Sequence, residues 1–413
     1  MKLKSLIHHN ALEQLPAVFP DATRRILLVA DQNTDQVAGR TVSAILRKHG
    51  YQCQECILRR ETALVADETA LAEIKAADNP ASDLYLAVGS GTITDLTRFA
   101  SFNAGKPFVA VPTAPSMDGY ASPVAALTLH GFKQTLPAAP PLAIVGDPEL
   151  IATAPPLMIA AGLGDLVGKY TALADWKLGQ IINAEPFAPE LETMVRSAVD
   201  QAVQSFEADY DPVTRAKLLT EALIISGEAM LTWGNSRPAS GAEHHLAHFW
   251  EMTALRHGHP AQLHGIKVGV ATLLVLEHYR KLFQLNRAEL QPLLDKFRPE
   301  TETAYLTRIK AAYDELAQAV LDDLQGCYRT PETRQQRQAN IVANWSGLQQ
   351  WVNSTMPTVE RVRAILAKAG APITAEAIGI GRSELATALQ NAKEVRVRYT
   401  VFRLAEDLGI TGL

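Results

Sequence analysis

The strongest constraint on the fold is a change of sequence pattern near residue 150. Before this point, short apolar runs that suit buried strands alternate with amphipathic segments of helical spacing. The expected strands cover 26–31, 51–58, 84–89, 108–112 and 141–147, and the expected helices cover 37–49, 67–77 and 92–104. Residues 123–136 predict a hairpin beside these strands. Alternation of this kind predicts a parallel sheet with helices on both faces.

After residue 150 the strand signals nearly vanish, and apolar residues recur at helical spacing. The expected helices cover 157–180, 191–207, 214–233, 242–256 and 266–284, with further ones toward the C-terminus. We therefore predict an α/β protein. A Rossmann-like parallel-sheet domain over 1–150 is followed by an all-helical domain over 151–413.

The charge balance argues against polyanionic partners. The chain has 39 Lys plus Arg against 44 Asp plus Glu, a net charge of -5 at pH 7. Proteins that bind nucleic acid or anionic membranes carry a basic excess, so we expect neither partner. No apolar run approaches the roughly 18 residues of a membrane span, and the first residues lack the apolar core of a signal peptide. Because three cysteines cannot form a disulfide framework, we expect a cytoplasmic protein.

Two of the cysteines form a C-x-x-C motif. Cys53 and Cys56 lie in the expected strand 51–58, where their odd spacing places them on opposite faces. Only Cys327 remains to join them, whereas a structural zinc site needs four ligands. Ordinary thiols are the favoured interpretation.

A glycine-containing turn follows the expected strand 84–89. Its residues are Gly89, Ser90, Gly91, Thr92 and Ile93. Glycines between a strand and a helix let backbone amides approach a phosphate, whose charge the helix N-terminus stabilises. The third glycine of the G-x-G-x-x-G pattern is absent, so a tight turn without a ligand is an equal alternative.

Polar residues also end two other expected strands. Thr113, Ser116 and Asp118 follow 108–112, at the strand end where open α/β sheets bind ligands. Asp31 ends the expected strand 26–31, where its carboxylate suits a ribose hydroxyl. An acidic residue there favours NAD over NADP, because a carboxylate repels the 2′-phosphate of NADP. The alternative for Asp31 is a cap for the next helix.

Histidines are concentrated in the helical part, with seven of eleven lying within 244–278. His244 and His248 are spaced i, i+4 and share one helical face, which suggests a metal, or a metal and its substrate. A further cluster comprises 257–260 and His264. Such density argues against purely structural histidines.

Asp165 is the candidate for a carboxylate ligand beside these imidazoles. It stands in a largely apolar helical segment, where an unpaired charge is costly to bury. A helix cap or a surface turn is the alternative.

In this order, the motifs resemble the sn-glycerol-1-phosphate dehydrogenase family. That family belongs to the larger group of iron-containing alcohol dehydrogenases, glycerol dehydrogenases and dehydroquinate synthases. The resemblance covers about residues 20–285, and the segment 398–409 resembles the family's end. The motifs that carry it are GSGTITDLTRFAS, VPTAPSMDGYASP, GLGDLVGKYTALADWKL, RPASGAEHHLAH and HGIKVG. It implies a dehydroquinate-synthase-like fold, with a dinucleotide-binding domain over 1–150 and a metal- and substrate-binding domain over 151–413.

The resemblance also implies a role for individual residues. One divalent metal would be held by Asp165, His244 and His264, with zinc favoured and nickel or iron compatible; a shift of one residue to His245 is the alternative. Asp118 and His248 would act at the substrate, with His248, or a water that it holds, carrying the proton. The implied residues for NAD or NADP are Asp31, Gly89, Ser90, Gly91, Thr92, Ile93, Thr113, Ser116 and Ser122.

The reaction implied by the resemblance is the reversible NAD(P)H-dependent interconversion of dihydroxyacetone phosphate and sn-glycerol 1-phosphate, a step of phospholipid metabolism. Hydride addition to a ketone places negative charge on oxygen, which a divalent ion stabilises. Arg237 and Lys169 are candidates for the phosphate, although either suits a surface ion pair. We expect a small phosphorylated triose or polyol as substrate, and a homodimer or larger homo-oligomer.

Three alternative functions remain. The first is a related glycerol or polyol dehydrogenase, or one acting on a sugar phosphate. The second is a cyclase (a lyase) of the dehydroquinate synthase type, which resembles the same architecture but normally carries Glu where this chain has Asp165. The third is a non-catalytic nucleotide-binding protein.

Overall fold

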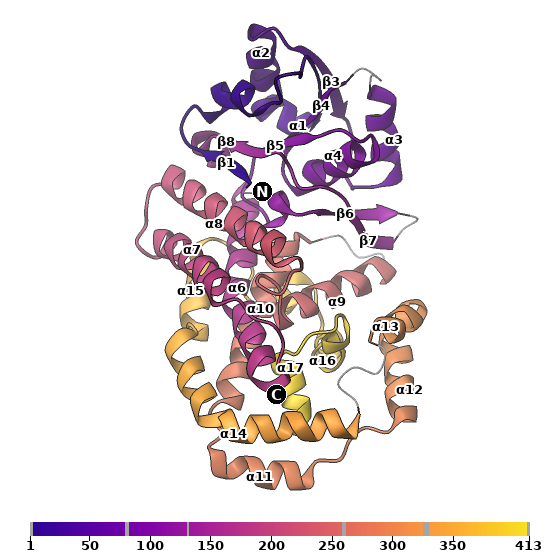
Figure 1. The fold of residues 1–413 in the computed structure, drawn as a ribbon, viewed down its shortest axis with the longest axis vertical. Coiled ribbons are helices and arrows are strands. Elements are labelled where there is room, and N and C mark those ends of the chain that lie inside the picture. The colour runs from indigo at the N-terminus through magenta and orange to yellow at the C-terminus, as the bar shows by residue number, and fades with distance from the viewer. Residues whose placement is uncertain (1–2, 79–81, 130–131, 258–261, 325–329, 411–413) are drawn as a thin grey trace. The chain divides into compact units, whose positions relative to one another are not determined.

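The computed structural model describes residues 3–78, 82–129, 132–257, 262–324 and 330–410. The chain forms two compact units. The first comprises Met1–Leu166 and Ser197–Asn235, and the second comprises Val167–Arg196 and Ser236–Leu413. Figure 1 shows the elements of each unit. That residues 1–150 bind the cofactor and residues 151–413 bind the metal and the substrate stays a prediction.

A parallel sheet forms the centre of the first unit. Its strands are β1 (Lys4–Ile7), β2 (Arg25–Asp31), β3 (Gln52–Leu58), β4 (Leu84–Gly89), β5 (Phe108–Pro112) and β8 (Ala143–Gly146). They lie in the order β1-β8-β5-β4-β2-β3, and every neighbouring pair is parallel. A separate antiparallel hairpin pairs β6 (Val124–Leu129) with β7 (Phe132–Pro137). The expected parallel sheet and hairpin are thus confirmed, with β1 as an additional strand; the hairpin turn at 130–131 lies outside the described residues.

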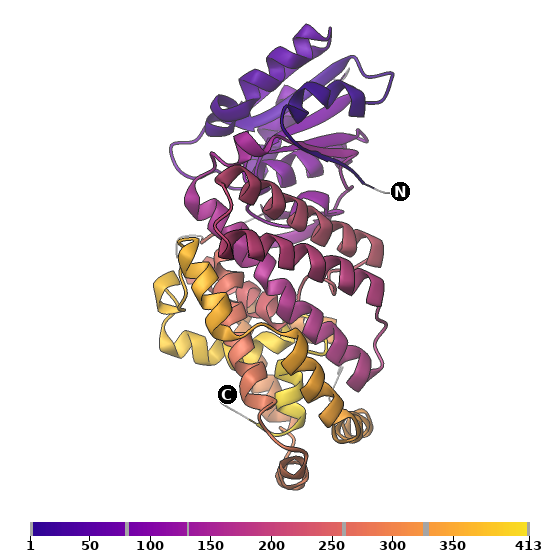
Figure 2. The same cartoon turned by 90° about the vertical axis from the view of Figure 1, so that its left-hand side faces the viewer.

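Helices cover both faces of this sheet. They are η1 (Ala11–Val18), α1 (Gln32–Thr34), η2 (Asp35–Gly39), α2 (Arg40–Lys48), α3 (Glu68–Ala77), α4 (Gly91–Asn103), η3 (Gly119–Ala121), α5 (Pro148–Ile151) and α8 (Pro212–Trp233). Along β2, Ile26, Leu28 and Ala30 pack toward η1 and α2, whereas Leu27 and Val29 pack toward α3 and α4. Burial on both faces explains why β2 is apolar without interruption. In Figures 1 and 2 the strands of this unit lie between helices.

The two cysteines of the C-x-x-C motif lie on opposite faces of β3, as expected. Cys56 is buried in the α3–α4 face, whereas Cys53 packs against the α2 face, and both are free thiols. Cys327 lies outside the described residues.

Among the described residues of the second unit, all regular secondary structure is helical, as predicted. Its elements are α9 (Ala242–His257), α10 (His264–Leu282), α11 (Arg287–Lys296), α12 (Glu302–Tyr313), η4 (Asp314–Leu316), α13 (Ala317–Leu324), α14 (Pro331–Thr355), α15 (Val359–Lys368), η5 (Glu376–Ile378), α16 (Arg382–Asn391), η6 (Ala392–Glu394) and α17 (Val401–Asp407). Two longer helices, α6 (Pro156–Asn183) and α7 (Pro189–Glu207), contribute residues to both units.

Within the described part of the chain, α6 alone has the length and composition of a membrane span. Its mean hydropathy reaches 1.2 over an 18-residue window, but 83% of that window is buried inside the protein. A core helix of a globular protein has the same properties.

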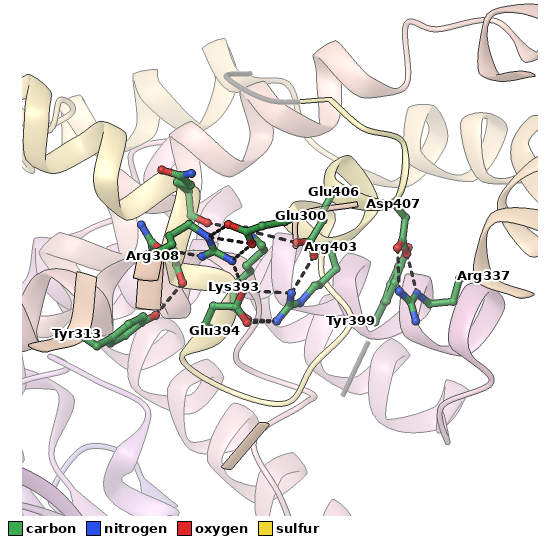
Figure 3. A network of polar contacts seen from close by, with 12 residues as sticks. Glu300, Arg308, Tyr313, Arg337, Lys393, Glu394, Tyr399, Arg403, Glu406 and Asp407 are labelled. Atoms are coloured by element: carbon green, nitrogen blue, oxygen red, sulfur yellow. Dashed lines mark hydrogen bonds and ion pairs between the residues drawn. The ribbon is translucent and has the colours of Figure 1, made fainter. Parts of the chain in front are cut away.

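Buried ion pairs hold the C-terminal segment of the second unit (Figure 3). Arg403 contacts Glu394 of η6, and Arg308 of α12 reaches the same carboxylate at 3.2 Å. Arg337 of α14 donates two hydrogen bonds to Asp407, at 2.7 and 2.8 Å. Because each cation meets a carboxylate, the charges are compensated despite their burial. The network fixes η6 and α17 against α12 and α14.

Candidate active site

The polar residues expected to bind a cofactor follow adjacent strands of the first unit. Asp31 ends β2, and Gly89 ends β4, its neighbour in the sheet. Strand β3 lies beyond β2, whereas β5 and β8 lie beyond β4, so the order of the chain reverses between β2 and β4. Open parallel sheets bind ligands at the carboxyl ends of strands where this reversal occurs.

The glycine turn itself is tightly packed. A Cβ on Gly89 would lie 2.6 Å from Cβ of Ile93, and one on Gly91 would lie 3.1 Å from the Met117 methyl group. Ser90 is the N-cap of α4, in extended conformation and without a side-chain cap hydrogen bond. The turn therefore presents backbone groups at a helix N-terminus, as phosphate sites do. Ile93 is 1% exposed and contributes packing rather than a polar contact.

The loop after β5 is fixed beside this turn. The Thr113 backbone N–H donates to the carbonyl oxygen of Gly89 at 3.2 Å. The guanidinium of Arg98, which is fully buried in α4, donates to the carbonyl oxygens of Gly119 and Tyr120 at 2.6 and 2.9 Å. The structure thus brings the glycine turn and the loop with Thr113 and Asp118 together. The hydroxyl residues expected to contact the cofactor are at most 9% exposed, namely Thr113, Ser116 and Ser122.

Asp31 caps a helix, which was its alternative role. Its Oδ1 accepts hydrogen bonds from the backbone N–H groups of Asn33 and Thr34, at 2.8 and 2.9 Å. Thr34 Oγ1 accepts in return from the Asp31 N–H, which completes a capping box. Both bonds to the carboxylate reach Oδ1, so the cap does not occupy Oδ2.

Two aspartates of the first unit are linked through a backbone hydrogen bond. The Asp118 N–H donates to Oδ2 of Asp165 at 3.0 Å, and the Ser226 hydroxyl donates to Oδ2 of Asp118, also at 3.0 Å. Asp165 is fully buried within α6, so it is neither a helix cap nor a surface turn residue. One turn before it, a Cβ on Gly162 would lie 1.6 Å from the Pro115 carbonyl oxygen. Helix α6 thus approaches the loop after β5 as closely as a backbone permits.

In the second unit, three histidines form one group. His244 and His248 lie on α9, and His264 begins α10, which packs against α9. The ring centroid of His264 lies 5.3 Å from that of His244 and 5.3 Å from that of His248. The ring centroids of His244 and His248 lie 6.0 Å apart. We call these three residues the histidine group.

Two buried glutamates orient the histidine group. Glu243 Oε1 lies 2.7 Å from Nδ1 of His244. Glu251 bonds the other two rings, with Oε1 at 2.9 Å from Nδ1 of His264 and Oε2 at 3.4 Å from Nδ1 of His248. A carboxylate on Nδ1 fixes the tautomer and leaves Nε2 as the coordinating atom, the arrangement found around metal-binding histidines. His248, Glu251 and His264 also each have a ligand atom within 4.8 Å of the others.

Glu243 is held as an ionised carboxylate. Its side chain is fully buried and accepts from the Thr171 hydroxyl and the Gly241 N–H, both at 2.6 Å. Burial raises the pKa of Glu243, but these donors and His244 outweigh burial and leave the pKa below its ordinary value. The negative charge is therefore available to support the neighbouring imidazole.

A second buried carboxylate braces the start of α9. Asp175 of α6 accepts from the Ala242 N–H and the Val401 N–H, each at 2.7 Å, and from the Tyr279 hydroxyl at 2.6 Å. Burial and the nearby Glu243 raise the pKa of Asp175 to about 8. Asp175 thereby ties α9, α10 and α17 together behind the histidine group.

His245 lies outside the histidine group. It is fully buried, and neither of its ring nitrogens has a hydrogen-bond partner among the described residues. Burial lowers the pKa of His245 well below its ordinary value, so the ring is neutral. His244 has the carboxylate partner expected of a metal ligand, and His245 does not.

The two candidates for phosphate binding, Arg237 and Lys169, differ in their surroundings. The Arg237 Nε donates to Glu185 at 3.0 Å, and its Nη2 donates to the Val397 carbonyl oxygen at 3.2 Å, so it forms the ion pair named as its alternative. Lys169 is fully buried in α6, which excludes a surface ion pair. Within the expected cluster 257–260, residues 258–260 lie outside the described residues.

Sequence reasoning did not assign the orienting residues, which are Glu243, Glu251, Thr171 and Asp175. The available signal was spacing, since Glu243 directly precedes His244 and Glu251 follows His248 by three residues. A carboxylate beside a histidine on a helix is common, however, and only the side-chain directions distinguish an orienting partner.

Comparison with known proteins identifies the family. The sequence model of the iron-containing alcohol dehydrogenases matches residues 6–155. A glycerol-1-phosphate dehydrogenase (NAD(P)+) from Halalkalibacterium halodurans is 42% identical over 303 residues, which cover 71% of this chain and 75% of the relative. A protein of the same name from Geobacillus thermodenitrificans is 32% identical over 96% of this chain and 90% of the relative.

Solved structures show the same fold. An iron-containing alcohol dehydrogenase from Corynebacterium glutamicum aligns with a TM-score of 0.59 and 16% identity, over 100% of this chain and 96% of the other. A probable glycerol dehydrogenase from Sinorhizobium meliloti aligns with a TM-score of 0.55 and 19% identity, over 89% and 96%. At these identities the structures establish the fold, and the sequence relatives establish the family. The chain therefore belongs to the glycerol-1-phosphate dehydrogenase family of enzymes, within the iron-containing alcohol dehydrogenases.

Proposed function

We propose that this oxidoreductase interconverts dihydroxyacetone phosphate and sn-glycerol 1-phosphate with NAD(P)H as hydride donor. The observation that carries the proposal is the histidine group, whose three Nδ1 atoms are bonded to the buried carboxylates of Glu243 and Glu251. The names of the relatives supply the substrate and the NAD(P) cofactor.

A divalent metal fits the donor atoms of these residues. We propose that Asp165, His244 and His264 hold it. The two imidazoles are oriented through Nδ1, and Asp165 offers a fully buried carboxylate. Two nitrogens and one carboxylate oxygen suit zinc, nickel or iron(II) and leave positions for a substrate. When bound, such an ion polarises a ketone carbonyl and stabilises the negative charge that hydride addition creates.

His248 is proposed to move the proton that completes the alcohol. Burial lowers the pKa of His248 to about 3, against the opposing influence of Glu251, so the ring is neutral. With Nδ1 directed at Glu251, Nε2 is the atom that exchanges a proton with the substrate. When the alcohol is oxidised, Nε2 accepts the hydroxyl proton, and Glu251 stabilises the imidazolium that forms. In the reverse direction, an imidazolium that has taken its proton from solvent donates it to the substrate oxygen. Asp118, oriented by the Ser226 hydroxyl, is proposed to hold a substrate hydroxyl.

The cofactor is proposed to bind along the sheet edge of the first unit. Backbone amides of Gly89 through Ile93 would hold the pyrophosphate, and the hydroxyls of Thr113, Ser116 and Ser122 would contact the nicotinamide half. Oδ2 of Asp31 would accept from a ribose hydroxyl, which favours NAD. The cytoplasmic location and the homodimer or larger assembly stay predictions.

The test compares metal-stripped enzyme with samples reconstituted with zinc, nickel or iron(II). NADH oxidation is followed with dihydroxyacetone phosphate, and with dihydroxyacetone as the control substrate. We expect metal-dependent oxidation with the phosphate ester only. Oxidation of neither substrate by metal-loaded enzyme would overturn the proposal and favour the cyclase class. Oxidation of dihydroxyacetone with equal efficiency would favour a polyol dehydrogenase.

A histidine variant tests the ligand assignment. His264→Ala should lose bound metal and all metal-dependent turnover, because it removes one of three ligands. His278→Ala is the matched control, since His278 lies on the same helix and its Nδ1 bonds the Leu274 carbonyl oxygen. The control should retain the metal, as measured by metal content after gel filtration. Full turnover by His264→Ala in metal-free buffer would refute the assignment.

A further inference from the structure

Arg396 carries a partly buried positive charge that forms no ion pair with any of the described residues. Its Nε is buried without a hydrogen-bond partner. Among the described residues, its guanidinium forms no hydrogen bond within 3.5 Å and no ion pair within 4.0 Å. Asp323 of α13 attracts it only at longer range. Burying an unpaired guanidinium costs free energy, and an anionic ligand would offset that cost.

The neighbouring arginines differ from Arg396 in this respect. Arg398 donates to the Ser236 hydroxyl at 2.7 Å and contacts the Ser240 carbonyl oxygen. Arg237 is paired with Glu185. Burial, together with the charges of Arg396 and Arg237, lowers the pKa of Arg398 to about 9. The three guanidiniums therefore make one positive region, in which Arg398 and Arg237 serve the protein's own structure.

This positive region lies beside the histidine group, within the second unit. Helix α9, which carries His244 and His248, packs against η6, two residues before Arg396. The charge of Arg396 acts on both His248 and His245, where it adds to the effect of burial in lowering each pKa. The positive region therefore acts on the imidazoles at which the substrate oxygen is proposed to bind.

The segment that carries Arg396 is held on both sides. Before it, Glu394 is fixed by Arg308 and Arg403 (Figure 3). After it, Arg398 is bonded to Ser236, at the turn that precedes α9. The backbone of this segment is thus already ordered, so binding a ligand orders only the side chain.

We propose that Arg396 binds the phosphate group of the substrate and thereby selects phosphorylated over unphosphorylated three-carbon substrates. This inference rests on the proposed function. A guanidinium matches phosphate with two parallel N–H···O bonds, and such charge-assisted bonds are strong where water is largely excluded. Arg396 acts in binding and positioning, while the histidine group acts at the carbonyl.

The experiment compares Arg396→Gln and Arg396→Lys with the metal-loaded wild-type enzyme. Arg396→Gln should raise KM for dihydroxyacetone phosphate about 10- to 100-fold, while kcat changes little. KM for NADH should be unchanged, and dihydroxyacetone should remain without measurable turnover. Arg396→Lys should restore part of the loss, because it returns the charge without the two-bond geometry. Arg382→Gln is the matched control, since Arg382 is an exposed residue of α16, and it should behave as wild type.

The outcomes separate this inference from the proposed function. Equal kinetics of wild type and Arg396→Gln on the phosphate ester would overturn the inference and leave the proposed function intact. A rise in KM for NADH alone would also overturn it, because it would place Arg396 at the cofactor. If the wild-type enzyme does not prefer the phosphate ester, the proposed function fails. Calorimetry with inorganic phosphate then decides whether Arg396 forms an anion-binding site. Phosphate binding that Arg396→Gln weakens tenfold or more supports an anion site, and equal binding overturns it.

Discussion

At the scale of single residues, the central feature is the support of three imidazoles by two carboxylates. Glu251 bonds His248 and His264 and also accepts from the Lys267 ammonium at 3.2 Å. Glu251 is 5% exposed and Lys267 is 6% exposed, so this contact is a buried, charge-assisted one. One carboxylate therefore positions the proposed proton carrier and one of the proposed metal ligands.

Glu251→Gln should weaken metal binding about 10- to 100-fold, because an amide supports the imidazole less well than a carboxylate does. The measurement is the dissociation constant for zinc, obtained by competition with a chelator. Glu277→Gln is the control on the neighbouring helix α10, where Glu277 forms a partly exposed pair with Arg363. Equal zinc affinity of the two variants would show that Glu251 does not position a ligand.

At the scale of elements, the site of the first unit depends on the close approach of α6 to the loop after β5. Gly162 permits this approach, since any Cβ there would overlap the Pro115 carbonyl oxygen. The same loop contains Ser116 and Asp118, and the Asp118 N–H is bonded to Asp165 one turn along α6. A displacement of the loop would therefore move residues proposed to contact cofactor and substrate.

Gly162→Ala should lower the free energy of unfolding by about 3 kcal/mol or more, because the added methyl group has no space. Gly347→Ala is the control within another helix, α14, where a Cβ has no neighbour within 4 Å. It should raise the free energy of unfolding by about 0.5–1 kcal/mol, since alanine favours helix. Urea unfolding measures both. Similar effects of the two substitutions would contradict the close approach.

At the scale of the whole molecule, buried ion pairs make stability depend on pH. Burial raises the pKa of Glu406, but Arg403 and Lys393 outweigh it and hold the pKa at about 2, below the ordinary 4.5. A depressed carboxyl pKa favours the folded state when the group is ionised. This stabilisation is complete above pH 4.5 and is lost as the pH falls toward 2.

Glu406→Gln should lower the free energy of unfolding by about 1–2 kcal/mol at pH 7, a magnitude reduced by the partial exposure of the side chain. The difference from wild type should shrink as the pH falls below about 4.5. Urea unfolding at several pH values between 7 and 3 measures it. A difference independent of pH would mean that Glu406 acts by packing rather than by charge.

The sequence alone determined the order and type of most elements. β4 over Leu84–Gly89 and β5 over Phe108–Pro112 have the predicted bounds, and the helical segments after residue 150 lie within a few residues of their predicted ranges. Periodicity reveals these elements because burial of one face is a property of neighbouring residues. Strand β1 was not predicted, because its four residues, half of them exposed, show no clear alternation of apolar and polar side chains.

Only the tertiary structure decided which polar groups meet. The bond from the Asp118 N–H to Asp165 joins residues 47 positions apart, and the one from Arg398 to Ser236 joins residues 162 positions apart. That no described residue bonds the Nε of Arg396 depends likewise on which side chains surround it after folding. The motifs named the candidate ligands, whereas their orientation by Glu243 and Glu251 arises from packing. The physical reason is that side-chain hydrogen bonds act over about 3 Å in space, and local sequence patterns do not record such long-range contacts.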